Sequence, residues 1–216
     1  MDILAKDCVQ KEHAPSLHQE KKRLRALLRS RRRGLSPADV KEKSQHIFEQ
    51  LRAFDPFQKA QTIACYSANE NEVLTAAIWQ GALTQGKAVY YPRITGDRTD
   101  LEFVRRYPGE RLVPGTFGIL IPPGENLLSR EQAADLVLVP GVGFDRQGHR
   151  LGRGRGYYDR ALRGVLAGAL RVALSYEFQL MPEIPVGPQD EAVQYIITET
   201  GLISCSAQNL SSLRLF

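Results

Sequence analysis

A short apolar run that leads into a stretch of glycine and arginine constrains this sequence more than any other feature. Residues 135–141 read DLVLVPG, and four adjacent aliphatic residues bounded by Pro140 and Gly141 predict a buried strand. The stretch from Gly141 onward, GVGFDRQGHRLGRGRGYYDR, holds six glycines and five arginines. Because ligands of open α/β sheets bind at the carboxyl ends of strands, we expect a site in this loop.

The remaining segments alternate between helical and strand-like patterns. Apolar spacing predicts helices over 19–33, 37–51, 74–83 and 157–168, a short helix near residue 130, and strands over 62–67, 87–91, 101–106, 171–176 and 195–199. Gly34 is expected to end the first helix, Ser36 to cap the second together with Asp39, and Pro92 to end its strand. Such alternation favours an α/β sheet covered by helices on both faces.

Composition narrows the class of protein. The chain has 216 residues, 43% of them apolar, which is enough for a core without covalent staples. Its three dispersed cysteines favour a reducing compartment over a disulfide framework or a zinc site. Without a membrane-length apolar stretch or a secretory signal, the chain is expected to be cytoplasmic. The net charge of +5 suits anionic partners, namely nucleotides, nucleic acid or an anionic membrane surface.

The glycine–arginine loop has the composition of a polyphosphate cradle. Glycines at 152, 154 and 156 let backbone N–H groups approach an anion, and the helix that follows adds positive potential. Arg150, Arg153 and Arg155 can grip phosphate oxygens in forked geometry. The loop is neither a Walker A motif nor a dinucleotide fingerprint. The alternative is a disordered RG segment that tracks RNA phosphates.

The stretch PGVGFDRQGHRLGRGRGYYDR closely resembles the signature of the 5-formyltetrahydrofolate cyclo-ligase family, also called methenyltetrahydrofolate synthetases. The resemblance extends over about residues 20–200 and includes the basic first helix, the NENEV and YPR segments and PVGPQD. It implies a single-domain three-layer α/β/α sandwich around a mixed, mostly parallel sheet. Residues 19–200 would form this domain, 1–18 a disordered leader and 201–216 a tail of uncertain order.

The resemblance also implies a reaction. Members of the family couple ATP hydrolysis to the cyclisation of 5-formyltetrahydrofolate, and release 5,10-methenyltetrahydrofolate, ADP and phosphate. The formyl oxygen takes the γ-phosphoryl group, N10 attacks the activated carbon, and phosphate leaves. The implied partners are ATP and a reduced folate with Mg²⁺ as cofactor, and we expect a monomer that binds neither nucleic acid nor membrane.

Carried over by position, the family's functional residues fall into four groups. ATP would be bound by the basic helix and the loop: Lys21, Arg25, Arg150, Gly152, Arg153, Gly154, Arg155, Gly156, Tyr157 and Tyr158. The catalytic group would be Arg153, Arg155 and Tyr157, which would also contact the folate. The substrate would be bound by Ser67 and Glu72. Arg93 is expected near the anionic site. Asp159 and Asp190 would bind the metal, since carboxylate oxygens suit Mg²⁺.

The sequence departs from the family's pattern near the expected metal site. Relatives often have a histidine before Asp190 and an aspartate four residues after it, where this chain has Gln189 and Gln194. The other arginines of the first helix are expected to face solvent. Two alternatives to the cyclo-ligase interpretation stay open: a paralogue that binds ATP but acts on another substrate, and an RNA-binding protein that uses the basic helix and the loop.

Overall fold

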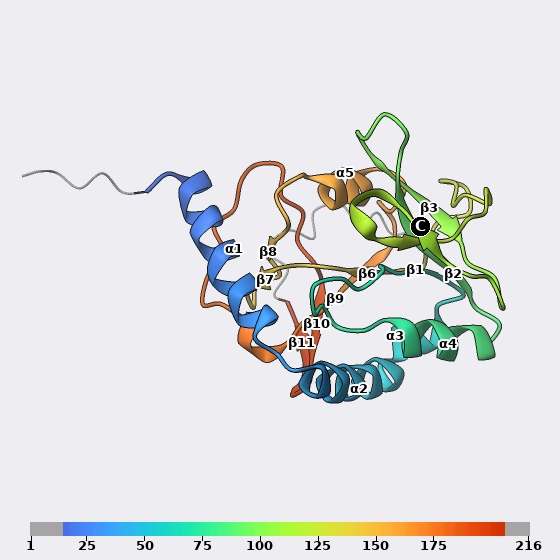
Figure 1. Ribbon diagram of the computed structural model, residues 1–216, viewed down its shortest axis with the longest axis horizontal. Coiled ribbons are helices and arrows are strands. Elements are labelled where there is room, and N and C mark those ends of the chain that lie inside the picture. Colours follow the sequence, from blue (N-terminus) through green and yellow to red (C-terminus); the bar gives the residue numbers. More distant parts are fainter. Residues whose placement is uncertain (1–14, 206–216) are drawn as a thin grey trace, which may run out of the picture.

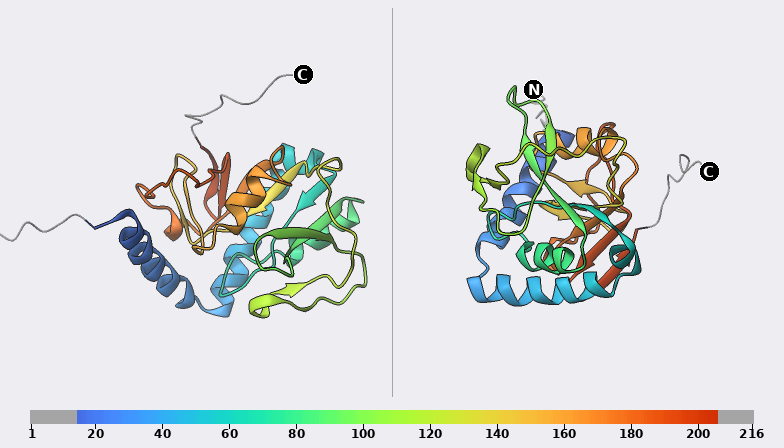
Figure 2. Two further views of the ribbon diagram at one scale, coloured as in Figure 1. Left: turned by 90° about the horizontal axis from the view of Figure 1, so that it is seen from above. Right: turned by 90° about the vertical axis from the view of Figure 1, so that its right-hand side faces the viewer.

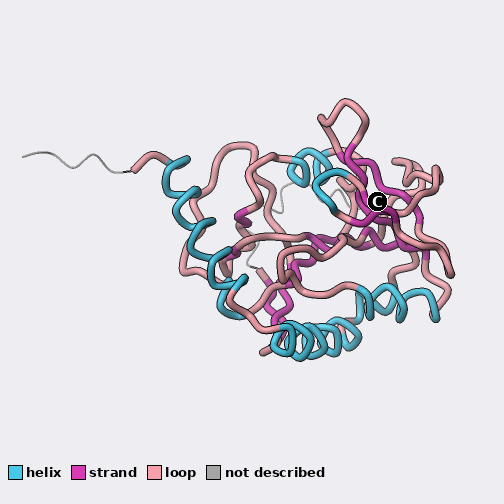
Figure 3. Tube along the Cα trace, in the orientation of Figure 1, coloured by secondary structure: helices cyan, strands magenta, loops and turns pink. Residues whose placement is uncertain are grey.

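The computed structural model describes residues 15–205 of the chain, so most of the expected leader and tail lies outside the described residues. Figures 1 and 3 show the elements. They are α1 (Leu17–Arg33), α2 (Pro37–Ala53), α3 (Asp55–Lys59), β1 (Thr62–Ala64), α4 (Ala76–Thr84), β2 (Ala88–Ile94), β3 (Leu101–Arg105), β4 (Val113–Pro114), a 3-10 turn (Thr116–Gly118), β5 (Leu120–Ile121), β6 (Leu136–Val139), β7 (Gly143–Phe144), β8 (Arg150–Leu151), α5 (Tyr157–Arg163), β9 (Leu170–Leu174), a second 3-10 turn (Glu177–Gln179), β10 (Tyr195–Thr198) and β11 (Gly201–Ser204).

The central sheet has seven strands in the order β11-β10-β9-β6-β1-β2-β3. The five inner strands run parallel to one another, and β11 and β3 pair antiparallel at the two edges. The sheet is therefore mixed and mostly parallel. Within residues 15–205, no helix is long and apolar enough to cross a membrane.

Helices cover both faces of this sheet, which makes three layers. Figure 1 shows α2, α3 and α4 below the sheet and α5 above it. In β6, Leu136 and Leu138 pack into the core on the side of α2–α4, while Val137 and Val139 pack into the core on the side of α5. All four are buried, which is why this strand is a continuous apolar run instead of an alternating one.

Helix α1 stands apart from both layers, at one end of the molecule (Figure 2). Its Leu24 and Leu28 pack against Val142, Leu151 and Ile184, in and beside the hairpin formed by β7 and β8. The helix ends are as predicted, because Gly34 caps α1 and Ser36 forms a capping box with Asp39 at the start of α2. The packing of α1 against the hairpin places its basic face beside the glycine–arginine loop.

The structure corrects several expected elements. Strand β2 continues through Pro92 to Ile94, because β1 pairs with it only as far as Tyr90 and a proline is tolerated where one side is unpaired. No helix forms near Arg130: the preceding segment runs beside β3, where Leu128 N donates to Phe103 O over 2.8 Å.

Two further differences concern element ends. Helix α5 ends at Arg163, five residues earlier than expected, and Gly164 follows it. At the start of the expected tail, residues 201–204 form β11, which extends the sheet beyond β10.

Candidate active site

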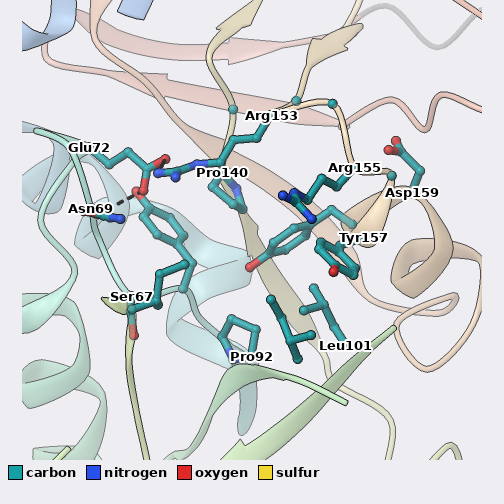
Figure 4. Close-up of a pocket in the computed structure, with 18 of the residues that line it drawn as sticks. Ser67, Asn69, Glu72, Pro92, Leu101, Pro140, Arg153, Arg155, Tyr157 and Asp159 are labelled. Carbon is teal, nitrogen blue, oxygen red and sulfur yellow. Dashed lines mark hydrogen bonds and ion pairs between the residues drawn. The ribbon is translucent and has the colours of Figure 1, made fainter. Parts of the chain in front are cut away.

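A cavity of about 670 Å³ opens at the carboxyl ends of β1 and β6. It is bounded by α1, by the segment after β1, by β2, by the β4–β5 hairpin and by the loop after β8. Figure 4 shows lining side chains from the segment after β1, from β2, from β3 and from the loop after β8, with Arg153 reaching toward Glu72. Every residue singled out from the sequence as a site residue lines it: Lys21, Arg25, Ser67, Glu72, Arg93, Arg150, Gly152, Arg153, Gly154, Arg155, Gly156, Tyr157, Tyr158, Asp159 and Asp190.

The glycine–arginine loop begins as a hairpin whose turn is organised by a buried acid. The Asp145 carboxylate accepts hydrogen bonds from the backbone N–H groups of Gln147, His149 and Ile184 over 2.9–3.0 Å. The chain then bends back toward the cavity at Gly154 and Gly156, whose φ angles of 95° and 69° suit glycine. This bend carries the arginines of the loop into the cavity.

The loop arginines contact groups from other elements. Arg150 Nη2 donates to Asp159 Oδ1 over 2.6 Å, and Arg153 Nη2 donates to Glu72 Oε1 over 2.9 Å. Figure 4 shows Arg155 beside Tyr157, pointing into the space between the loop and the opposite wall. The loop therefore presents guanidinium groups along one side of the cavity.

Helix α1 contributes a basic face, and here the expectation of solvated arginines was wrong for two residues. Lys21 pairs with Asp190, and Arg25 Nε donates to Gly152 O over 2.8 Å. Arg29 lines the cavity and pairs with Glu70 over 2.8 Å, while Arg32 is only 1% exposed. Burial lowers the pKa of Arg32, and the charge of Glu72 opposes that shift.

The segment after β1 supplies two acids at the opposite wall. Glu72 is 7% exposed, and its second oxygen, Oε2, accepts from Asn69 N over 3.1 Å. Burial raises the pKa of Glu70, but hydrogen bonds from Arg29 and the charges of Arg29, Arg153 and Arg32 outweigh it, so the pKa is lowered. Both acids thus lie among cations.

The remaining expected site residues are Ser67, two tyrosines and Arg93. Ser67 Oγ donates to Leu120 O over 2.5 Å, which ties the segment after β1 to the β4–β5 hairpin. Tyr157 OH donates to Arg98 O over 2.9 Å, and burial raises the pKa of Tyr158. Arg93 lines the cavity but pairs with Glu102 over 2.5 Å and with Glu125 over 3.2 Å.

The two aspartates expected to bind magnesium line the same cavity, each with a cation beside it. Asp159 contacts Arg150, and Asp190 contacts Lys21. Burial raises the pKa of Asp190, but hydrogen bonds from Lys21 and from Gly187 N outweigh it and lower the pKa. Within residues 15–205 no three His, Cys, Asp or Glu side chains converge on a metal position. Two carboxylates suit Mg²⁺ when phosphate oxygens and water complete its shell.

The glutamines that depart from the family's pattern do not line the cavity. Gln194 Oε1 accepts from Arg171 N over 2.6 Å, so its side chain serves the junction between β9 and β10. Asp190 keeps its place in the cavity beside Lys21 without them.

Sequence reasoning missed four residues that build the site: Arg29, Arg32, Asn69 and Glu70. The signal for Arg29 was present, because Lys21, Arg25 and Arg29 recur every four residues and so share one helical face. For Asn69 and Glu70 the signal was their place just before Glu72, at the end of a predicted strand. Arg32 continues the four-residue spacing of Leu24 and Leu28, and so shares the buried face of the helix.

Comparison with known proteins points to a single family. The sequence pattern of the 5-formyltetrahydrofolate cyclo-ligase family matches residues 17–199. The chain is 31% identical to the 5-formyltetrahydrofolate cyclo-ligase of Mus musculus, covering 86% of this chain and 97% of that one. It is 28% identical to the enzyme of the same name from Escherichia coli K12, covering 80% and 96%.

A solved structure is similar over nearly the whole chain. The NMR structure of Aquifex aeolicus 5,10-methenyltetrahydrofolate synthetase has a TM-score of 0.77 and 30% identity, covering 90% of this chain and 96% of that one. The family match spans the described domain, from α1 to the end of β10. This chain therefore belongs to the 5-formyltetrahydrofolate cyclo-ligase family.

Proposed function

We propose that this protein catalyses the ATP-dependent cyclisation of 5-formyltetrahydrofolate to 5,10-methenyltetrahydrofolate, with release of ADP and phosphate. The observation that carries the proposal is one cavity in which the arginines of the loop face the Glu72 acid. A phosphate-binding surface and a pterin-binding acid within one cavity suit a reaction that joins a nucleotide to a folate.

The chemistry explains why the loop is rich in arginine. The amide-like formyl oxygen is a poor leaving group, so it first attacks the γ-phosphorus and ADP departs. N10 then forms a bond to the activated formyl carbon and loses its proton, and the C–O bond breaks as phosphate leaves with the former formyl oxygen. Catalysis of this kind rests on positioning and on neutralising charge, which fixed guanidinium groups supply.

We assign the phosphate end of the cavity to α1 and the loop. Lys21 and Arg25 would contact ATP phosphates together with Arg150, Tyr158 and the backbone N–H groups at Gly152, Gly154 and Gly156. Arg153, Arg155 and Tyr157 belong to the same stretch of chain and line the cavity, and they would also contact the formyl group as it accepts the phosphoryl group. Asp159 and Asp190 would hold Mg²⁺, which supplies further neutralisation of phosphate charge.

We assign the other end to the folate. Glu72 would accept two hydrogen bonds from the ring N–H and amino group of the pterin, and Ser67 lies on the same wall. Pro92, Ile94 and Leu101 line the same cavity, and would give the flat ring an apolar surface to pack against.

The experiment is an absorbance assay of the purified protein with 5-formyltetrahydrofolate, Mg²⁺ and ATP, which follows the near-ultraviolet band of the methenyl product. Product that forms only with ATP is the expected result. ATP binding without product would point to another substrate for the same cavity. Tight RNA binding that depends steeply on salt, with no response to ATP, would favour the RNA-binding alternative.

A further inference from the structure

Glu72 is shared by two arginines, and they differ in how firmly they are held. Arg153 Nη2 and Arg32 Nη1 approach the same oxygen, Oε1, at 2.9 Å and 3.5 Å. The other oxygen accepts from Asn69 N. Arg153 donates a hydrogen bond to Oε1, and the Arg32 guanidinium lies within ion-pairing distance of the same oxygen, so two cations crowd Oε1 while Oε2 meets one backbone N–H.

Arg32 is fixed by several contacts at once. Its side chain is 2% exposed, and Nε donates to Glu70 O over 2.9 Å. Nη1 reaches Gly141 O at 3.5 Å, and Nη2 lies 3.5 Å from the Glu70 carboxylate. Moving this guanidinium away from Glu72 would break all of these contacts inside a buried site, which is costly.

Arg153 is held far less firmly. Its side chain is 38% exposed, and it extends from a loop between Gly152 and Gly154. Beyond Glu72, the Glu70 carboxylate lies 3.9 Å from its guanidinium group. The same loop carries Arg150 and Arg155 along the proposed phosphate end, so a change of rotamer leaves Arg153 within the cavity.

We propose that folate binding displaces Arg153 from Glu72 and makes it available to the phosphates of ATP, while Arg32 stays as the fixed counter-ion of the acid. This inference rests on the proposed function. A pterin that takes one hydrogen bond on each oxygen of Glu72 needs a position on Oε1, and Arg153 is the partner able to leave it. Arg32 then keeps the buried carboxylate paired during the exchange.

The exchange couples the two ligands. Energy that holds Arg153 on Glu72 opposes nucleotide binding in the absence of folate, and that opposition disappears once folate is bound. By linkage, each ligand therefore tightens the other by the same factor. The acid thus serves as pterin ligand and as a restraint on an arginine of the phosphate end.

The test is calorimetric titration of a non-hydrolysable ATP analogue with Mg²⁺, without and with saturating 5-formyltetrahydrofolate. In the wild type, folate should tighten the analogue by about fivefold or more, the lower range of coupling between sites. Glu72→Gln should bind the analogue more tightly than the wild type without folate, and folate should no longer change that affinity. Arg153→Ala should also lose the coupling, but with weaker binding of the analogue.

Glu70→Gln is the matched control, because it removes the same charge from the same cavity wall. The Glu70 carboxylate lies 3.9 Å from the Arg153 guanidinium, whereas the Glu72 carboxylate lies 2.9 Å from it. An equal gain in Glu70→Gln and Glu72→Gln would be a general charge effect and would overturn the proposal. Independent binding of the two ligands to a wild type that forms product would also overturn this proposal, but it would leave the proposed function intact. A wild type that binds neither ligand would overturn the proposed function, and this inference with it.

Discussion

At the end that we assign to phosphate, α1 and residues 150–159 present guanidinium groups and glycine backbone. At the end that we assign to folate, the segments after β1 and along β2 present apolar side chains and the buried acid Glu72, which pairs with Arg153. The first end suits a ligand recognised by its charge, because the bend at Gly154 and Gly156 brings the N–H groups of the loop close to the cavity. The second suits a flat ring recognised by shape and by a pair of hydrogen bonds. Substitutions at the phosphate end should therefore mainly lower kcat, and substitutions at the folate end should mainly raise the KM for the folate.

The largest effect is expected at the phosphate end. Arg155→Ala should lower kcat by at least about 100-fold while the fold stays intact, because it removes a positive charge aimed at the transferring phosphoryl group. The methenyl absorbance gives the rate and circular dichroism the fold. Arg146→Ala is the control, since Arg146 is exposed in the β7–β8 turn and does not line the cavity. Near-normal turnover in Arg155→Ala would remove this residue from the catalytic group.

The acid at the other end should act mainly on substrate affinity. Glu72→Ala should raise the KM for 5-formyltetrahydrofolate by roughly 10- to 100-fold, the value of a charged hydrogen-bonded contact, with a smaller change in kcat. Steady-state kinetics at varied folate separate the two parameters. An unchanged folate KM would contradict the assignment of Glu72 to the pterin.

The bend of the loop can be tested through stability. Gly154→Ala should lower the free energy of unfolding by about 1–3 kcal/mol, because alanine is strained at a φ of 95°. Its methyl group would also lie 3.4 Å from the Arg25 guanidinium carbon. Denaturant unfolding measures the change, and Gly168→Ala is the matched control because nothing lies within 4 Å of its added carbon. Equal stability of the two variants would argue against the bend.

The smallest effect concerns pH. The folded pKa of Asp190 lies below its ordinary value of 3.8, so its stabilising contribution is present above that value and is lost as pH falls through the folded pKa. Between pH 6 and pH 3 the wild type should therefore lose more unfolding free energy than Asp190→Asn. Parallel pH profiles for the two proteins would show that the Lys21–Asp190 contact does not stabilise the fold.

Local rules predicted the parts of the fold that depend on neighbouring residues. The capping residues Gly34 and Ser36 and the apolar run of β6 act within a few residues, so their outcome could be read from the sequence. Pro92 did not end its strand, because a proline is tolerated in β2 beyond the point where β1 stops pairing. The helix expected near Arg130 did not form, because the backbone of Leu128 pairs with a strand some 25 residues earlier. Both are consequences of tertiary pairing.

In the site, too, residues within a local motif could be predicted from the sequence, and residues placed by tertiary packing could not. Its loop and Asp159 lie in one recognisable signature, Asp190 lies in the later PVGPQD segment, and all of them line the cavity as expected. Arg32 lies on the face of Leu24 and Leu28, but the polar partners that allow an arginine to be buried there, Glu70 O and Gly141 O, lie 38 and 109 residues away. The spacing indicates which face is buried, and the tertiary packing of α1 supplies these partners.

The most direct test of the account follows the formyl oxygen. The protein is supplied with 5-formyltetrahydrofolate labelled with ¹⁸O in the formyl group, together with Mg²⁺ and unlabelled ATP, and the released phosphate is analysed by mass spectrometry. The account predicts one ¹⁸O atom in each phosphate formed per turnover, because the formyl oxygen leaves with the transferred phosphoryl group. Unlabelled phosphate, formed together with methenyl product, would contradict activation of the formyl group by phosphoryl transfer.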